Sequence, residues 1–156
     1  MAMIEHVRDH VIPAAMSLLP ANMDTPPARV MLLAIGLQES RFIHRKQVRG
    51  PARGFWQFET GGVSGVARHH ASKDHLRGVC DALRYDAEGV YGTIADNDTL
   101  ACAVARLLLW THPEPLPVNA QSAWEYYIDL WRPGKPHRGT WDGFYAEASR
   151  NIGVIL

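Results

Sequence analysis

The chain has 156 residues, 47% of them apolar, and its basic residues (Lys plus Arg) equal its acidic residues (Asp plus Glu) at 16 each. This length suits one domain, residues 1–156, built around one hydrophobic core, and the apolar fraction excludes a disordered chain. A net charge of zero argues against nucleic-acid binding, and the lack of an apolar run of about 18 residues excludes a membrane-spanning helix.

Two helices are predicted in the first quarter of the chain. The first covers residues 4–19, and Pro13 is expected to bend or split it because proline has no N–H to donate. Thr25 and Pro26 are typical of a helix start, and the second helix is expected to continue to Ser40. This second helix is apolar nearly all round, which predicts a central, buried position.

The middle of the chain is predicted to be less regular. Residues 41–53 are basic and contain Gly50 and Pro51, so we expect an exposed loop. The aromatic residues in 54–58 predict a short strand, and a short helix is expected over residues 63–68.

The second half of the chain carries further helical patterns. The predicted helices are 72–85 capped by Ser72, 98–109 capped by Asp98, 120–131 stopped by Pro133 and Gly134, and 140–152 capped by Thr140. Strands and helices do not alternate, so no parallel sheet is expected. The predicted fold is α+β and predominantly α, with a small β or irregular lobe in the middle of the chain.

The cysteines and the N-terminus bear on the compartment. Cys80 and Cys102 lie among apolar helical residues, so we expect reduced core thiols, with a single disulfide as the open alternative. Charged residues such as Glu5 and Arg8 interrupt the N-terminal segment, so no signal peptide is expected. We therefore expect synthesis in a cytoplasm, with export by another route.

Glu39 is the leading candidate for chemistry. It is predicted to lie in the last helical turn before Ser40, where the negative end of the helix dipole disfavours another negative charge. Burial would also raise the pKa of its carboxyl group. A carboxyl group that stays protonated near neutral pH can donate a proton to the leaving oxygen of a sugar. The alternative is a surface glutamate at a fraying helix end.

An aromatic and amide segment follows about eighteen residues later. Gln57 offers an amide donor and acceptor, and Phe55 and Trp56 have the ring faces on which sugars stack. Consecutive strand residues point to opposite sides, so at least one of the two aromatic side chains is expected to pack in the core instead.

These two segments together resemble a known family. Residues 38–40 (Gln-Glu-Ser) with Phe42, followed by residues 52–57 (Ala-Arg-Gly-Phe-Trp-Gln), resemble the lytic transglycosylases and goose-type lysozymes of the lysozyme-like superfamily. The resemblance covers about residues 26–58 and implies a lysozyme-like fold, a peptidoglycan substrate and no cofactor. The overall pattern is similar to small phage-encoded members of the group.

The resemblance also implies roles for individual residues. Glu39 would be the catalytic acid and base, and Ser40 would support the end of the helix beside the substrate. Gln57 would bind sugar, and its neighbours Phe55 and Trp56 would line the same groove.

The chain departs from the family in a third motif. The family carries Ala-Tyr-Asn-x-Gly on a later helix, whose tyrosine approaches the catalytic glutamate, and this motif is not present as such. The nearest candidate lies in residues 124–135, where we prefer Tyr127 to Tyr126 as the groove residue. Tyr127 and Trp131 share a helical face at i, i+4, and core packing of both rings is the alternative.

The expected activity is that of a lytic transglycosylase, which cuts the β-1,4 bond between N-acetylmuramic acid (MurNAc) and N-acetylglucosamine (GlcNAc) with one glutamate. An inverting hydrolase needs a second carboxylate to activate water, for which Glu59, Asp96 and Asp98 are candidates. A virion or cell-wall binding component that keeps the fold without turnover is a further alternative.

The expected partners follow from the same resemblance. They are peptidoglycan glycan strands at the cell wall, with association with a phage particle left open. His69, His70 and His75 match no recognised ligand spacing, so no metal is expected.

Overall fold

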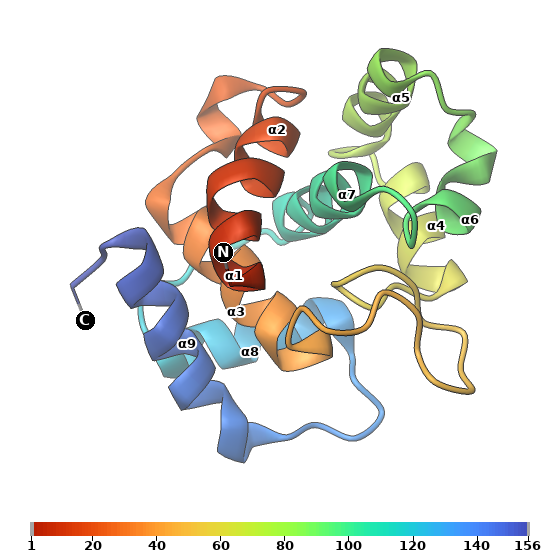
Figure 1. The fold of residues 1–156 in the computed structure, drawn as a ribbon. Helices are drawn as coiled ribbons and strands as arrows, with labels where there is room; N and C mark the ends of the chain where they lie inside the picture. Colours follow the sequence, from red (N-terminus) through yellow and green to blue (C-terminus); the bar gives the residue numbers. More distant parts are fainter. Residues whose placement is uncertain (1, 156) are drawn as a thin grey trace.

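Helices form almost all of the regular secondary structure in residues 2–155, which are the residues that the computed structural model describes (Figure 1). In chain order they are α1 (Met3–His6), the π-helix η1 (Val7–Val11), α2 (Ile12–Met16), the 3-10 helix η2 (Ala21–Met23), α3 (Pro26–Ser40), α4 (Thr60–Arg68), α5 (Lys73–Leu83), the 3-10 helix η3 (Ala87–Gly89), α6 (Val90–Thr93), α7 (Asp98–Trp110), α8 (Ala120–Trp131) and α9 (Arg138–Ile152). The prediction of a predominantly α fold is confirmed.

Helix α7 lies at the centre of the arrangement. In Figure 1, α1 to α3 and α9 lie on one side of α7, and α4 to α6 lie on the other. The contacts agree, because α2, α3, α4 and α5 each pack against α7, and α3 also packs along α9. The buried apolar side chains of all these helices form a common cluster.

The first predicted helix is interrupted just before Pro13, the residue expected to bend or split it. Helix α1 passes into η1, in which the N–H of Ile12 donates to the carbonyl of Val7, five residues back. Pro13 has no N–H to offer to the carbonyl four residues before it, and a π turn is a common way to absorb such a gap. The helix ends at Met16, short of the predicted Leu19.

Helix α3 is buried along most of its length, as the sequence predicts, although α7 is the helix at the centre. Thr25 caps it, and its side chain accepts a hydrogen bond from the N–H of Ala28 at 3.3 Å. The helix ends at Ser40, and Arg41 takes a left-handed conformation with φ of 55°. The N–H of Arg41 bonds back to the carbonyls of Gly36 and Leu37, which closes the helix end.

The predicted strand at residues 54–58 is wrong. Within residues 2–155, β pairing is limited to two isolated bridges, which join Arg53 to Lys46 and to Phe58. Gly54 and Gln57 have φ values of 76° and 53°, and this left-handed backbone cannot continue a strand. The segment is a turn closed by the N–H of Gln57 on the carbonyl of Gly54 at 3.0 Å. The lobe between α3 and α4 is therefore irregular.

Two predicted helix caps are replaced by other residues, and a third makes no capping hydrogen bond. Asn97 caps α7 in place of Asp98, through a hydrogen bond of 2.9 Å from the N–H of Leu100. His137 occupies the N-cap position of α9 in place of Thr140. Ser72 does sit before α5, but its hydroxyl donates to the carbonyl of Val66 instead of capping. At α7 the two adjacent polar residues take different partners, because Asp98 forms an ion pair with Arg45.

Two further expectations from the sequence concern the cysteines and membrane-spanning helices. Cys80 and Cys102 are buried free thiols, as expected. Among the described helices, none has the length and apolar character needed to cross a membrane.

Candidate active site

Glu39 lies in the last turn of α3, with its side chain half-buried. Ser40 fixes this turn from inside the protein, since its hydroxyl donates to the carbonyl of Gly36 and accepts from the N–H of Phe42, each at 3.1 Å. Ser40 is itself buried, so it supports the helix end as expected and presents little surface to a ligand.

The surroundings of Glu39 favour its protonated form. Burial raises the pKa of the Glu39 carboxyl group, and the nearby charge of Glu59 raises it further. The hydroxyl of Tyr127 donates to Oε2 of Glu39 at 2.7 Å, which stabilises the carboxylate and lowers the pKa. Burial is the larger effect, so the pKa lies above its ordinary value.

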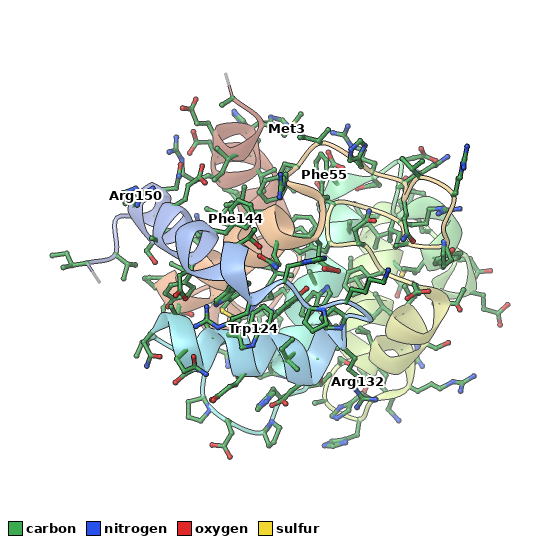
Figure 2. The ribbon with its side chains drawn as sticks, turned by 90° about the horizontal axis from the view of Figure 1, so that it is seen from below. Met3, Phe55, Trp124, Arg132, Phe144 and Arg150 are labelled. Atoms are coloured by element: carbon green, nitrogen blue, oxygen red, sulfur yellow. The ribbon has the colours of Figure 1, made fainter. Side chains whose placement is uncertain are left out.

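Tyr127 reaches Glu39 from α8, and packing holds its ring in place. The ring stacks on Trp141 of α9 with an interplanar angle of 9° and a centroid distance of 5.1 Å. Burial raises the pKa of the Tyr127 hydroxyl, so it keeps its proton and acts as a donor. Trp124, also on α8, contacts the rings of both Tyr127 and Trp141 and completes this aromatic layer (Figure 2).

Tyr126 turns away from Glu39. Its hydroxyl lies near the carbonyls of Leu109, at 3.0 Å, and Glu114, at 3.3 Å. Burial raises the pKa of Tyr126 to about 12. Of the two tyrosines, the structure therefore brings Tyr127 to the candidate acid.

Phe55 and Trp56 are both fully buried, which corrects the expectation that they offer ring faces to a sugar. Both rings meet Phe42 edge to face, at centroid distances of 5.4 and 6.0 Å. The indole N–H of Trp56 donates to the carbonyl of Leu32 at 2.9 Å. These side chains attach the irregular lobe to α3, and so they set the position of the chain around Glu39. A strand would have pointed one of the two side chains toward solvent, whereas the observed turn points both into the core.

Gln57 is half-buried, and part of its amide group is already engaged. Its Nε2 donates to the carbonyl of Gly54 at 2.8 Å, with a longer contact of 3.5 Å to the carbonyl of His44. These bonds stabilise the turn. No hydrogen bond joins Gln57 to Glu39 among the described residues.

Trp131 is a site residue that the sequence argument gave no role in binding. It lies half-buried at the end of α8, with its ring 6.2 Å from Tyr127 and 5.7 Å from Phe58. Its indole N–H donates to the carbonyl of Trp56 at 2.9 Å. Trp131 also lines a hollow of about 320 Å³, together with glycines from the start of α4. The i, i+4 spacing from Tyr127 was the signal for its position.

Gln38 is a second residue without a predicted role. Its Nε2 donates to the carbonyl of His137 at 3.0 Å, and its Oε1 accepts from the hydroxyl of Thr140 at 2.9 Å. These bonds join the start of α9 to the end of α3, beside Glu39. Gln38 is thus a positioning residue for the candidate acid.

The three candidates for a second carboxylate differ in availability. Asp98 forms a bidentate ion pair with Arg45, with both distances 2.9 Å. Asp96 is exposed on the loop before α7. Glu59 is exposed at the start of α4 and lies close enough to Glu39 to raise its pKa. Of the three, Glu59 is therefore the carboxylate whose charge acts on the pKa of Glu39.

Among the residues that the structure describes, no three His, Cys, Asp or Glu side chains gather in a way that would hold an ion. His69 and His70 stack on each other at 4.5 Å.

No family model matches the chain, and no curated protein and no solved structure matches it either. The family resemblance of residues 26–58 and the geometry around Glu39 are therefore the basis for a functional proposal.

Proposed function

We propose that this chain is a peptidoglycan-cleaving enzyme with a lysozyme-like fold, and that it acts as a lytic transglycosylase on the β-1,4 bond between MurNAc and GlcNAc. The observation that carries the proposal is the half-buried carboxyl group of Glu39, with its raised pKa and its hydrogen bond from Tyr127. The resemblance of residues 26–58 to the lytic transglycosylases supplies the substrate class.

The proposed reaction uses Glu39 twice. In its protonated form Glu39 donates its proton to the glycosidic oxygen, and the bond between that oxygen and the anomeric carbon of MurNAc breaks. A hydroxyl of the same MurNAc then attacks the anomeric carbon, and its proton passes to the Glu39 carboxylate. Glu39 returns to the acid form, no water is consumed, and the product ends in an anhydro sugar.

Tyr127 supports both steps in this proposal. Its hydroxyl holds one oxygen of the Glu39 carboxyl group in a fixed direction while the other is free to exchange the proton. Once the proton has left, the same hydrogen bond becomes charge-assisted and stabilises the carboxylate.

The test is digestion of purified cell-wall sacculi by the full chain and by Glu39→Gln. Glu39→Gln keeps the size of the side chain and removes the transferable proton, so release of soluble fragments should fall by at least about 100-fold. Circular dichroism should show that the variant stays folded. Retained activity in Glu39→Gln would contradict the proposal, as would sacculus binding by the wild-type chain without fragment release.

An inverting hydrolase is the second candidate, because Glu59 is exposed and influences the pKa of Glu39. Glu59 would then activate a water molecule on the far side of the sugar ring. The products separate the two reactions, since an anhydro end is lighter by one water than a hydrolysed end. Loss of activity in Glu59→Gln together with hydrated product ends would favour the hydrolase.

A further inference from the structure

Two loops near Glu39 carry half of the basic side chains of the chain. They are the first basic loop, residues 41–53, and the second basic loop, residues 132–138. Together they hold eight of the 16 Lys and Arg residues and contain no Asp or Glu, although the whole chain has a net charge of zero. A surface of one sign attracts ligands of the opposite sign. The segregation therefore points to an anionic ligand at these loops.

Both basic loops run between the end of α3 and the turn that contains Trp56. The first basic loop is the direct connection between them along the chain. The second begins beside the turn, where the indole N–H of Trp131 donates to the carbonyl of Trp56 at 2.9 Å. It ends beside α3, where Nε2 of Gln38 donates to the carbonyl of His137 at 3.0 Å. In Figure 1 both loops lie next to the end of α3, and so both border Glu39.

Most of the exposed charges in these loops have no acidic partner. Arg45 pairs with Asp98, and Arg138 pairs with Asp142. Glu59 forms no ion pair with either loop. The other exposed Lys and Arg side chains of the loops form no ion pair within residues 2–155, and they are Arg41, Lys46, Arg49, Arg132 and Lys135. These cations are therefore available to a ligand in solution.

The first basic loop also exposes apolar side chains. Ile43 is 67% exposed and Val48 is 74% exposed. Among the described residues, the most exposed large apolar side chains include no aromatic ring, so the surface lacks the platforms on which single-stranded nucleic-acid bases stack. Basic and aliphatic side chains together fit a ligand that carries carboxylates and small apolar groups.

We propose that the two basic loops bind the carboxylates of the short peptides attached to MurNAc, the peptide stems. This inference rests on the proposed function, in which a peptidoglycan strand lies over Glu39. The sugar chain is uncharged where its lactyl groups are joined to peptides, so the negative charges of this substrate are the peptide carboxylates. Lys and Arg donate charge-assisted hydrogen bonds to them, and Ile43 and Val48 contact the methyl groups of alanine. The chain therefore prefers strands that carry peptides to bare strands.

The test measures binding of the full chain with Glu39→Gln to sacculi from which phosphate-containing polymers have been removed. One batch is native, and in a second batch carbodiimide and ethanolamine convert the peptide carboxylates to neutral amides. We expect binding at least about tenfold weaker for the amidated batch. Binding to the native batch should also weaken between about 0.05 and 0.3 M salt, because salt screens exposed charges.

Equal binding to the two batches, or binding to neither, would overturn the proposal. Tighter binding to phosphatidylglycerol vesicles or to single-stranded DNA than to native sacculi would overturn it as well. Fragment release by the wild-type chain, measured on both batches, tests the proposed cleavage separately. Failure of the peptide-stem inference is thereby distinguished from failure of the proposed function.

Variants that remove charge locate the binding surface. The pair Lys46→Gln with Arg49→Gln, and Lys135→Gln alone, change exposed residues outside the ion pairs of residues 2–155. Each should weaken binding to native sacculi several-fold and leave binding to amidated sacculi unchanged. Arg68→Gln with Lys73→Gln is the matched control, because it removes two exposed charges from α4 and α5, outside both loops. A control that loses as much affinity as the loop variants would overturn the assignment to the loops.

Discussion

At the scale of single residues, the proposed chemistry depends on two opposing effects on the pKa of Glu39. Burial at the end of α3 favours the neutral acid, and the hydroxyl of Tyr127 favours the carboxylate. The balance leaves a group that holds its proton more strongly than an exposed glutamate does and still has a partner once the proton leaves. A general acid and base needs both properties.

Tyr127→Phe should move the pKa of Glu39 upward, because the lost hydrogen bond had stabilised the carboxylate. The Phe ring can still stack on Trp141. A hydrogen bond to a charged group contributes about 1.5–3 kcal/mol, so we expect kcat/KM to fall about tenfold or more. The basic limb of the pH–activity profile should move to higher pH.

Tyr126→Phe is the matched control for this change. Tyr126 is also buried, but its hydroxyl lies against the carbonyls of Leu109 and Glu114 and not against Glu39. The variant should lose some stability and keep the pH profile of the wild type. A shifted profile in Tyr126→Phe, or an unshifted one in Tyr127→Phe, would disprove the assignment of Tyr127.

Glu39→Gln should also change how stability depends on pH. The folded pKa of Glu39 lies above its unfolded value near 4.5, so the folded state holds the proton more tightly and loses stability as pH rises through that interval. Gln has no proton to lose. Compared with the wild type, the variant should therefore be relatively more stable at about pH 8 than at about pH 4, as measured by urea unfolding. A stability difference that moves the other way with pH would contradict a raised pKa.

The sequence pattern indicates Glu39 as the candidate acid but does not reveal its full environment. Glu39 was predicted as a proton donor because the apolar helix pattern ends beside it. At that position the negative end of the helix dipole disfavours a charged carboxylate. The inward turn of Phe55 and Trp56 was missed, because it depends on left-handed residues at Gly54 and Gln57 that an aromatic pattern does not reveal.

At the scale of elements, the tight end of α3 determines where Glu39 points. Gly36 lies directly beneath the ring of Phe42, which follows the left-handed residue Arg41. A side chain at position 36 would overlap that ring and push the turn outward.

Gly36→Ala should destabilise the protein by about 1–3 kcal/mol through overpacking, and it should lower activity by displacing the turn after Glu39. Gly78→Ala is the control, because Gly78 is exposed within α5 and has open space around it. That change should stabilise the protein by about 0.5–1 kcal/mol. Chemical denaturation of both variants checks this, and equal effects of the two would contradict the packing argument.

Helix positions were predictable because their apolar residues recur with the helical period over many residues. Helix α8 has the predicted bounds, Ala120–Trp131, and α3 begins at the predicted cap. The cap of α7 was less predictable, because the side chains of Asn97 and its neighbour Asp98 can both cap a helix. In the structure Asn97 caps α7, and Asp98 forms an ion pair with Arg45.

At the scale of the whole molecule, the candidate site joins distant parts of the chain. Glu39 and Tyr127 are 88 positions apart, and Gln38 ties α3 to the start of α9 across a similar span. Periodicity identifies helices but does not say which ones meet, so the pairing of α3 with α8 and α9 came from the structure. The family resemblance suggested the meeting of a tyrosine with the glutamate without deciding which tyrosine.

The two cysteines report on global unfolding. Cys80 and Cys102 are buried, and burial raises the pKa of both thiols, which reduces the reactive thiolate. A thiol reagent should label neither residue quickly in the folded protein and both in urea without a reducing agent. Fast labelling in the absence of urea, or a need for reductant in urea, would contradict two buried free thiols.

The most direct measurement of the central claim is the titration of the Glu39 carboxyl carbon by NMR, with the resonance assigned from Glu39→Gln. We expect the pKa of Glu39 to lie clearly above the ordinary glutamate value, and to rise further in Tyr127→Phe. A pKa at or below the ordinary value would show a carboxylate that is already ionised, and Glu39 would then lack the proton that the proposed cleavage requires.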